Sequence, residues 1–268
     1  VLDIRDFPGD SVQDIVVHDY EIILKDPQIS IIVETMGGIN PAYDFVKRAL
    51  LAGKSVCSSN KELVAEHGAE FLAIAKEKGK NFLFEASVGG GIPIIRPLKE
   101  CLTADEIEQI SGILNGTTNY ILTKMANEGS DFADVLKEAQ QLGYAEKDPT
   151  ADVEGHDACR KIAILGSLAF GKQVDYKDIY TEGITKITPE DFAYAKKLGW
   201  SIKIFGSCMR SDNKYYAMVA PVMIDETHPL FNVNDVFNGI SVKGNMLGDV
   251  VFCGKGAGKL PTASAVVS

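Results

Sequence analysis

The first third of the chain alternates short apolar runs with longer amphipathic segments, and this alternation restricts the fold more than any other feature. The expected strands span 29–34, 55–58 and 81–88, and the expected helices span 41–51 and 61–78. A β-α-β-α-β order predicts an α/β fold with a parallel, doubly wound sheet. No complete glycine fingerprint opens the chain, so we expect the first strand and its phosphate-binding turn to lie upstream of Val1.

Local signals place the ends of these elements. Asn40 is the expected N-cap of the first helix, with Pro41 at its first position, and Gly79 is expected to end the second helix. Ligands of such Rossmann-type sheets bind at the carboxyl ends of the strands. In this chain those ends carry Thr35 to Gly38, Ser58 to Lys61 and Ser87 to Gly91.

Two of these segments allow more than one interpretation. Lys61 begins a helix, where a cation is electrostatically disfavoured, so either a ligand anion compensates its charge or the side chain extends into water. Ser87 to Pro93 joins a strand to a helix. It either cradles an anion or forms a tight turn whose carbonyl groups face a cation or a substrate.

The remainder of the chain mixes strands and helices without this strict alternation. Expected strands span 107–114, 200–209, 215–223, 239–242 and 247–252, and expected helices span 117–127, 131–142, 154–170 and 189–198. This order predicts an α+β second domain. At the start of the 117–127 helix, Thr117 or Thr118 is the expected cap, and the polar segment Asn115 to Tyr120 also fits a pocket wall.

Between residues 148 and 161 the chain carries four carboxylates and one lysine that enters an apolar segment. Asp157 and Lys161 are four residues apart, so a helix places them on one face. A lysine between carboxylates and an apolar wall is a candidate proton donor, because burial and neighbouring charges tune an ammonium group. The alternative is an exposed helix pair worth only about 0.3–0.5 kcal/mol. Glu146, Asp148 and Asp152 either form a solvated acidic loop or bind a substrate ammonium.

Composition excludes several classes of protein. The net charge of −10 and the absence of a basic patch argue against a nucleic-acid or anionic-membrane partner. Five cysteines, an odd number without a CxxC pair, favour a reduced, cytoplasmic compartment and disfavour a zinc site. The longest apolar runs, about ten residues, are too short to span a bilayer. Because the chain begins with Val1, we expect its natural N-terminus to be absent.

Six segments together resemble homoserine dehydrogenase, in the same order and over essentially the whole chain. They are residues 33–38, 58–63, 84–93, 112–120, 143–155 and 254–258. The resemblance implies NAD(P)-dependent interconversion of L-homoserine and L-aspartate 4-semialdehyde, a step towards threonine and methionine. It also implies a partial nucleotide-binding domain at 1–87, completed by 254–268, and a catalytic and dimerisation domain at 88–253.

The resemblance also implies roles for individual residues. Lys161 is the implied proton donor and acceptor for the substrate oxygen, and Lys61 lies beside the nicotinamide and the reacting centre. Glu146 and Asp157 are implied to bind the amino-acid substrate. The implied cofactor neighbours are Lys61, Ser59, Gly143 and Gly258, and the implied sodium ligands are Glu85, Val88, Gly90 and Ile92. The family is typically oligomeric through the second domain's sheet, so a homodimer is expected.

Other functions remain open at this point. The cofactor is NADP or NAD, because Arg5 is placed to read a 2′-phosphate and the adjacent Asp6 a ribose hydroxyl. One rival function is a related dehydrogenase that acts on another amino-acid aldehyde or keto acid. A second rival is a non-catalytic binding module that kept the fold. The retained lysines and acids argue against the second rival.

Overall fold

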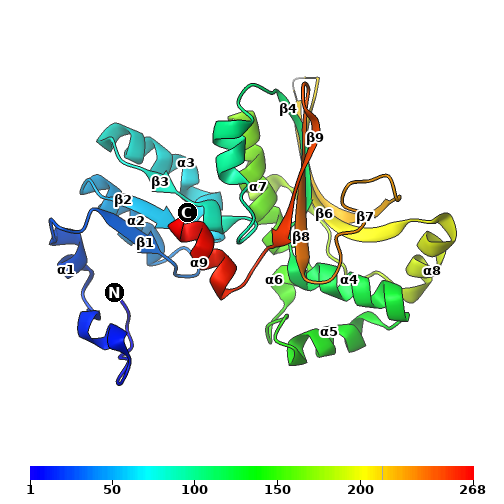
Figure 1. Ribbon diagram of the computed structural model, residues 1–268, viewed down its shortest axis with the longest axis horizontal. Coiled ribbons are helices and arrows are strands. Elements are labelled where there is room, and N and C mark those ends of the chain that lie inside the picture. Colours follow the sequence, from blue (N-terminus) through cyan, green and yellow to red (C-terminus); the bar gives the residue numbers. More distant parts are fainter. Residues whose placement is uncertain (213) are drawn as a thin grey trace. The chain divides into compact units, whose positions relative to one another are not determined.

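The computed structural model describes residues 1–212 and 214–268. The chain divides into two compact units, Val1–Leu83 and Phe84–Ser268, each with its own sheet (Figure 1). The domain boundary after residue 87 stays a prediction. Residues 254–268 belong to the second unit by their contacts, so their contribution to nucleotide binding stays a prediction. Within the described ranges, no helix combines the length and the apolar character needed to cross a membrane.

The first unit contains the predicted parallel sheet. Its elements are the 3-10 helix Ser11–Ile15, α1 (Tyr20–Lys25), β1 (Ile31–Glu34), α2 (Ala42–Leu51), β2 (Ser55–Ser58), α3 (Lys61–Lys78) and β3 (Phe82–Leu83). The strands lie in the order β1-β2-β3, and both pairs are parallel. The predicted α/β class is therefore confirmed, with α2 and α3 connecting successive strands (Figure 1).

Local chemistry explains where α3 begins and ends. Asn60 caps it by accepting a hydrogen bond from the Leu63 N–H at 3.1 Å, and Gly79 ends it with a positive φ of 63°. The predicted start of α2 was wrong by one position, because Pro41 rather than Asn40 occupies the N-cap and supplies no side-chain bond.

The predicted strand 81–88 was also wrong beyond its first residues. β3 ends at Leu83, and a 3-10 turn, Glu85–Ser87, follows. The Ser87 hydroxyl and its N–H both donate to the Phe84 carbonyl, at 2.6 and 3.0 Å. A side chain that bonds to the local backbone in this way stabilises a turn in place of a strand.

The second unit is built on a six-stranded sheet. Its strands are β4 (Ile107–Ile113), β5 (Tyr180–Thr181), β6 (Ser201–Ser211), β7 (Lys214–Ile224), β8 (Phe237–Gly244) and β9 (Gly248–Lys255), in the order β5-β7-β6-β4-β8-β9. Its helices are α4 (Gly116–Glu128), α5 (Phe132–Gln141), α6 (Thr150–Val153), α7 (His156–Phe170), α8 (Pro189–Leu198) and α9 (Lys259–Val267). Short turns occupy Pro97–Cys101 and Tyr176–Asp178.

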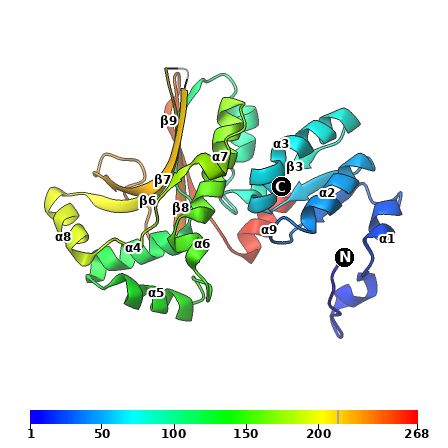
Figure 2. The same ribbon diagram turned by 180° about the vertical axis from the view of Figure 1, so that it is seen from behind.

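The sheet and helices of this unit confirm the predicted α+β arrangement. Only the pairing of β5 with β7 is parallel among the described strand pairs of this sheet. Helix α7 packs against β4, β6 and β7, and α4 packs against β6 and β8 (Figures 1 and 2). A core cluster comprises Ile113, Phe205 and Ile224 from the strands, and Leu230 and Val233 from the segment before β8. The packing of α4 and α7 on the sheet fixes the ends of β4, α4 and α7 relative to one another.

A buried lysine on this sheet lies outside every predicted site. Lys203 on β6 is 2% exposed, and its ammonium donates to the Val233 carbonyl and to Asn234 Oδ1, both at 2.7 Å. Asn119 of α4 donates to the same Val233 carbonyl at 3.2 Å. These bonds tie the loop before β8 to the sheet and to α4. Burial lowers the pKa of Lys203 to about 8, although the charge of Asp235 opposes this shift.

We expect the free energy of unfolding to rise with pH between about 8 and 10.5 through Lys203. Over that interval the unfolded chain keeps the lysine proton that the folded chain has lost, so deprotonation favours the folded state. The full shift corresponds to at most about 3 kcal/mol. Urea unfolding of the parent and of Lys203→Met at several pH values measures the difference. The parent should gain stability relative to the variant as pH rises, and parallel curves would contradict the assignment.

Candidate active site

The carboxyl edge of the first unit's sheet holds a buried carboxylate that the sequence analysis did not select. Glu34 ends β1 and is 4% exposed. It accepts hydrogen bonds from Ser58 Oγ at 2.6 Å and from the Met36 N–H at 2.7 Å. Burial raises the pKa of Glu34 in spite of these donors. Because Glu34 pairs with Ser58 in register, β1 and β2 end together at the edge where such sheets bind ligands.

The segment after β1 is held against the start of α3 and remains open to a ligand. Asn60 Nδ2 donates to the Gly38 carbonyl at 2.6 Å. A Cβ atom added to Gly37 would meet no atom within 4 Å, so the main chain here is accessible. An accessible glycine backbone beyond a strand end suits a dinucleotide, which needs close main-chain approach. The predicted residues Ser59 and Lys61 lie beside it, both half-buried.

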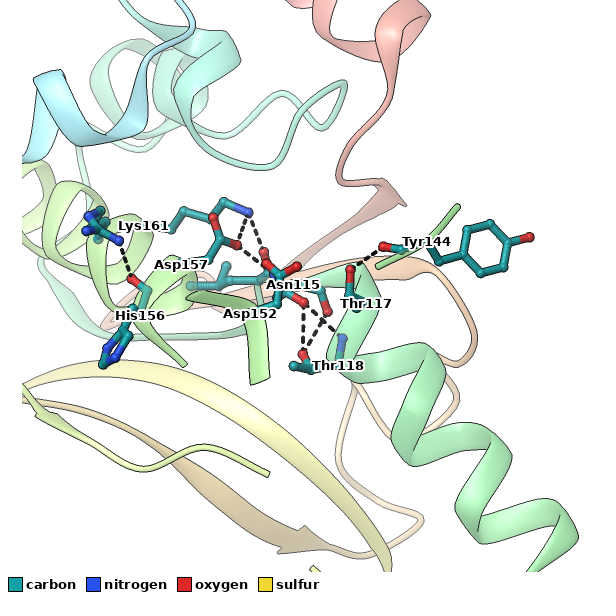
Figure 3. Close-up of polar contacts among 10 residues, drawn as sticks. Asn115, Thr117, Thr118, Tyr144, Asp152, His156, Asp157 and Lys161 are labelled. Carbon is teal, nitrogen blue, oxygen red and sulfur yellow. Dashed lines mark hydrogen bonds and ion pairs between the residues drawn. The ribbon is translucent and has the colours of Figure 1, made fainter. Parts of the chain in front are cut away.

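In the second unit, Asp157 and Lys161 lie on one face of α7, as their spacing predicts. Lys161 Nζ donates to Asp157 Oδ2 at 2.7 Å and to the Leu114 carbonyl at 2.8 Å (Figure 3). Lys161 is 8% exposed and Asp157 is 2% exposed, which rules out the exposed helix pair. In such a buried pair, loss of one partner costs about 3–5 kcal/mol, because the other charge is left uncompensated.

Asn115, which the sequence placed in a polar segment that fits a pocket wall, connects this pair to a second carboxylate. Its Nδ2 donates to Asp152 Oδ1 at 2.7 Å and to Asp157 Oδ2 at 2.9 Å (Figure 3). Its Oδ1 accepts from the Thr118 N–H at 2.9 Å and so caps α4. The prediction that Thr117 or Thr118 caps this helix was therefore wrong. Thr117 instead donates its hydroxyl to the Tyr144 carbonyl at 2.7 Å.

The remaining predicted acids lie in the exposed segment 143–149 between α5 and α6. Glu146 is exposed, and its carbonyl accepts from Gln140 Nε2 at 3.0 Å. Asp148 accepts from the Thr150 hydroxyl at 2.6 Å, which holds the pKa of Asp148 below its ordinary value. Of the acids in this part of the chain, Asp152 and Asp157 therefore meet through Asn115, whereas Glu146 and Asp148 face solvent.

Two predicted cofactor glycines occupy positions with a structural requirement of their own. Gly143 has a φ of 75° and follows the last turn of α5, where its N–H donates to the Gln140 carbonyl at 3.1 Å. Gly258 precedes α9 with a φ of 114°. Both angles lie in the region that favours glycine. The glycine type is thus explained by the backbone, and the cofactor role of each stays a prediction.

The predicted sodium segment forms a folded turn with its carboxylate already engaged. The Glu85 carboxylate accepts from the N–H groups of Ile94, Ile95 and Arg96 at 2.7, 2.9 and 2.8 Å. Gly90 has a φ of 55°, and a Cβ atom on it would lie 2.6 Å from the main chain of Gly256. The described residues contain no group of three or more His, Cys, Asp or Glu side chains that would hold a metal ion. Main-chain carbonyl oxygens are therefore the donors that this turn offers.

A parallel sheet with ligand-accessible strand ends, joined to a unit that buries a lysine–carboxylate pair, is typical of NAD-linked dehydrogenases as a class. Comparison with known families agrees. Residues 9–85 match the NAD-binding domain of homoserine dehydrogenase, and residues 93–268 match the model of homoserine dehydrogenase itself. The chain belongs to the homoserine dehydrogenase family.

Individual relatives agree along nearly the whole chain. It is 49% identical over 259 residues to homoserine dehydrogenase from a Synechocystis strain, a match that covers 95% of this chain and 60% of that relative. The crystal structure of a homoserine dehydrogenase from Thiobacillus denitrificans superposes with a TM-score of 0.91 at 47% identity, covering 94% of this chain and 58% of that one. A hyperthermophilic archaeal homoserine dehydrogenase in complex with NADPH gives a TM-score of 0.81 at 30% identity, and the match covers 93% of this chain and 72% of that one. The chain thus spans about three-fifths of the length of the first two relatives.

Proposed function

We propose that the protein interconverts L-homoserine and L-aspartate 4-semialdehyde with NAD or NADP as the redox partner. The observation that carries the proposal is the buried Lys161 ammonium, held at 2.7 Å by Asp157 and at 2.8 Å by the Leu114 carbonyl. Family membership supports the same substrate pair. The NADPH complex of the archaeal relative supports a dinucleotide as cofactor.

Lys161 acts on the proton in the proposed reaction. Aldehyde reduction places negative charge on the carbonyl oxygen, and an ammonium stabilises that charge and then donates its proton. In the oxidation of homoserine the neutral amine takes the hydroxyl proton instead. The dinucleotide, when bound, accepts or supplies the hydride. Among the described residues, the two bonds of Lys161 to Leu114 and Asp157 leave one donor of the ammonium for the substrate oxygen.

The other predicted site residues complete the proposal. Asp157 and Glu146 bind the substrate ammonium, which an acidic pair holds near the reacting centre. The exposed position of Glu146 leaves its carboxylate accessible to a substrate. Lys61 and Ser59 stand at the ligand-binding edge of the first sheet beside the dinucleotide. Gly143 and Gly258 approach the same cofactor through their main chain.

We infer a sodium site at the turn of residues 85–92, formed by main-chain carbonyls of Glu85, Val88, Gly90 and Ile92. Oxygen donors suit a hard cation. The Glu85 carboxylate is not counted among the donors, because three main-chain N–H groups already occupy it. Comparison of turnover in sodium and in choline chloride tests the site, and equal rates would argue against a catalytic contribution of the ion.

We propose a homodimer formed through the sheet of the second unit. Alternate residues of β7, namely Tyr216 and Met218, are 52% and 40% exposed, and Val251 on the edge strand β9 is 37% exposed. Residues two apart on a strand share a face, so β7 presents large apolar side chains to solvent, as interfaces do. Light scattering of the purified protein gives its mass in solution, and a monomer at micromolar concentration would contradict the proposal.

The decisive experiment is homoserine-dependent reduction of NADP and of NAD by the purified protein, followed by nicotinamide absorbance. We expect turnover with at least one cofactor, and the ratio of the two rates gives the preference. We also propose a cytoplasmic location and a role in threonine and methionine synthesis, and complementation of a homoserine auxotroph tests the biosynthetic role. Folded protein without turnover would favour a related aldehyde or keto-acid substrate, and then a binding module.

A further inference from the structure

Asn115 connects the β4–α4 junction to the two helices that carry the acid and base groups of the candidate site, α6 and α7. It stands between β4 and α4, and its Nδ2 bonds Asp152 of α6 and Asp157 of α7 (Figure 3). The carbonyl of its neighbour Leu114 accepts from Lys161. Asp157 Oδ2 thus receives two donors, Lys161 Nζ at 2.7 Å and Asn115 Nδ2 at 2.9 Å.

The orientation of the Asn115 amide is fixed by its second function as a helix cap. Its Oδ1 accepts from the Thr118 N–H at 2.9 Å and from the Thr118 hydroxyl at 3.1 Å. Rotating the amide by half a turn would place its NH₂ group against a backbone donor and its oxygen against two carboxylates. The NH₂ group therefore has to face Asp152 and Asp157, and the side chain is 6% exposed.

We propose that Asn115 is a positioning residue that holds the Asp157 carboxylate where, together with the Leu114 carbonyl, it aims the Lys161 ammonium at the substrate oxygen. This inference rests on the proposed function and adds a residue to it. Two of the three ammonium donors are directed by Asp157 and Leu114, so the direction of the third follows from where these two acceptors lie. Rotation of Asp157 would turn that donor away from the substrate.

Asn115 also separates two negative charges. The titratable groups that face it are Asp152 from α6 and Asp157 and Lys161 from α7. Tyr144 of segment 143–149 contacts α4 through its carbonyl, which accepts from Thr117, and through its ring, which lies 4.9 Å from the ring of Tyr120. Neighbouring carboxylates without a donor between them favour a shared proton, because like charges repel. With one N–H directed at each, Asp152 and Asp157 both remain acceptors.

Asn115→Asp tests this role with almost no change of shape. The remaining oxygen keeps the cap of α4, while a third carboxylate replaces the donor facing Asp152 and Asp157. Added negative charge favours the protonated form of every neighbouring group. We expect the pH profile of kcat/KM for homoserine oxidation to move upward by about one unit or more. On the rising limb this is about a tenfold loss of rate.

Three further variants separate positioning from a merely structural role. Asn127→Asp adds the same charge at the exposed end of α4 and should leave the midpoint of the kcat/KM pH profile unchanged. Asn115→Asp combined with Asp152→Asn restores the number of carboxylates and returns a donor to the bridge, so the midpoint should move back. Asn115→Ser keeps a capping oxygen and loses both bridges. It should lower kcat by about 10²-fold without changing the KM for the dinucleotide.

An unchanged midpoint in Asn115→Asp, in active and folded protein, would overturn the proposal. If the parent itself does not oxidise homoserine, the proposed function fails. The proposed contacts of Asn115 are then tested by the free energy of unfolding of the variant and of the parent, measured as a function of pH. A third carboxylate in this cluster has a raised pKa, so Asn115→Asp should lose stability relative to the parent as pH rises from about 4 to 7. If the difference in stability between Asn115→Asp and the parent stays constant over this pH range, the side chain does not face the two carboxylates. That result would overturn the proposal independently of activity.

Discussion

Replacing Lys161 with alanine is expected to lower turnover of homoserine by about 10²–10⁴-fold, the usual contribution of a positioned proton donor. The affinity for the dinucleotide should change little, because Lys161 bonds Asp157 and the Leu114 carbonyl within the second unit. Turnover is followed by nicotinamide absorbance, and cofactor affinity by quenching of protein fluorescence. Near-normal turnover of Lys161→Ala would remove the residue from the chemistry.

Stability has to be separated from chemistry in this experiment. Alanine removes the Lys161 ammonium from the Asp157 carboxylate, which is 2% exposed, and loss of one partner of a buried pair costs about 3–5 kcal/mol. Lys161→Arg keeps a positive charge but cannot give up its proton, so it should lose turnover with a smaller loss of stability. Turnover of Lys161→Arg at the parent's rate would show that charge suffices. Lys172→Ala, at the exposed end beyond α7, is the matched control and should behave as the parent.

The pairing of Asp157 with Lys161 could be predicted because it depends only on their spacing along one helix. A spacing of four residues in a helix is enough to bring the two side chains together, whatever packs around them. The second partner of Lys161, which lies one residue after β4, could not be predicted in this way. The Leu114 carbonyl is 47 residues earlier in the sequence, and only the packing of α7 on the sheet brings it within 2.8 Å.

Caps show the same division between local and distant causes. Helix α8 has the predicted bounds, 189–198, and local chemistry sets both of its ends. Thr188 and Asp191 form a capping box within four residues, and Gly199 ends the helix. At α4, by contrast, Asn115, Thr117 and Thr118 are all competent caps. The choice among them is made by carboxylates 37 and 42 residues away, which take both donors of Asn115 and leave its oxygen for the helix.

A distant contact also explains why the predicted strand 81–88 ends at Leu83. Residues 84–88 are apolar enough to suggest a continuation, yet Glu85 extends its carboxylate to the N–H groups of residues 94–96. An acidic side chain in that position stabilises the start of the following helical turn. The apolar residues of this segment are visible in the sequence, whereas the hydrogen-bond donors of the Glu85 carboxylate are not. The strand was therefore predicted too long.

Gly183→Ala is expected to be the most destabilising single methyl group that can be added near the candidate site. A Cβ atom at this position would lie 2.1 Å from the Val153 carbonyl oxygen and 2.5 Å from Glu154 Cα. Both are main-chain atoms at the junction of α6 and α7, so no side-chain rotation relieves the overlap. The adjacent Ile184 N–H also donates to the Val153 carbonyl at 2.8 Å. Overpacking of this kind costs about 3 kcal/mol or more.

The consequence should reach the chemistry, because that junction separates Asp152 from Asp157. A shift of the Val153 main chain would move one carboxylate relative to the other and strain the Asn115 bridge. We expect the melting temperature to fall by about 6 °C or more and turnover to fall in the protein that remains folded. Gly37→Ala is the matched control for the melting temperature alone, since its Cβ would meet no atom within 4 Å but the residue lies where we expect the dinucleotide to bind. A glycine-to-alanine change without overlap is neutral or stabilising by about 0.4–1 kcal/mol. Equal melting temperatures for Gly183→Ala and the parent would mean that the main chain at this junction yields, and that the bridge does not depend on it.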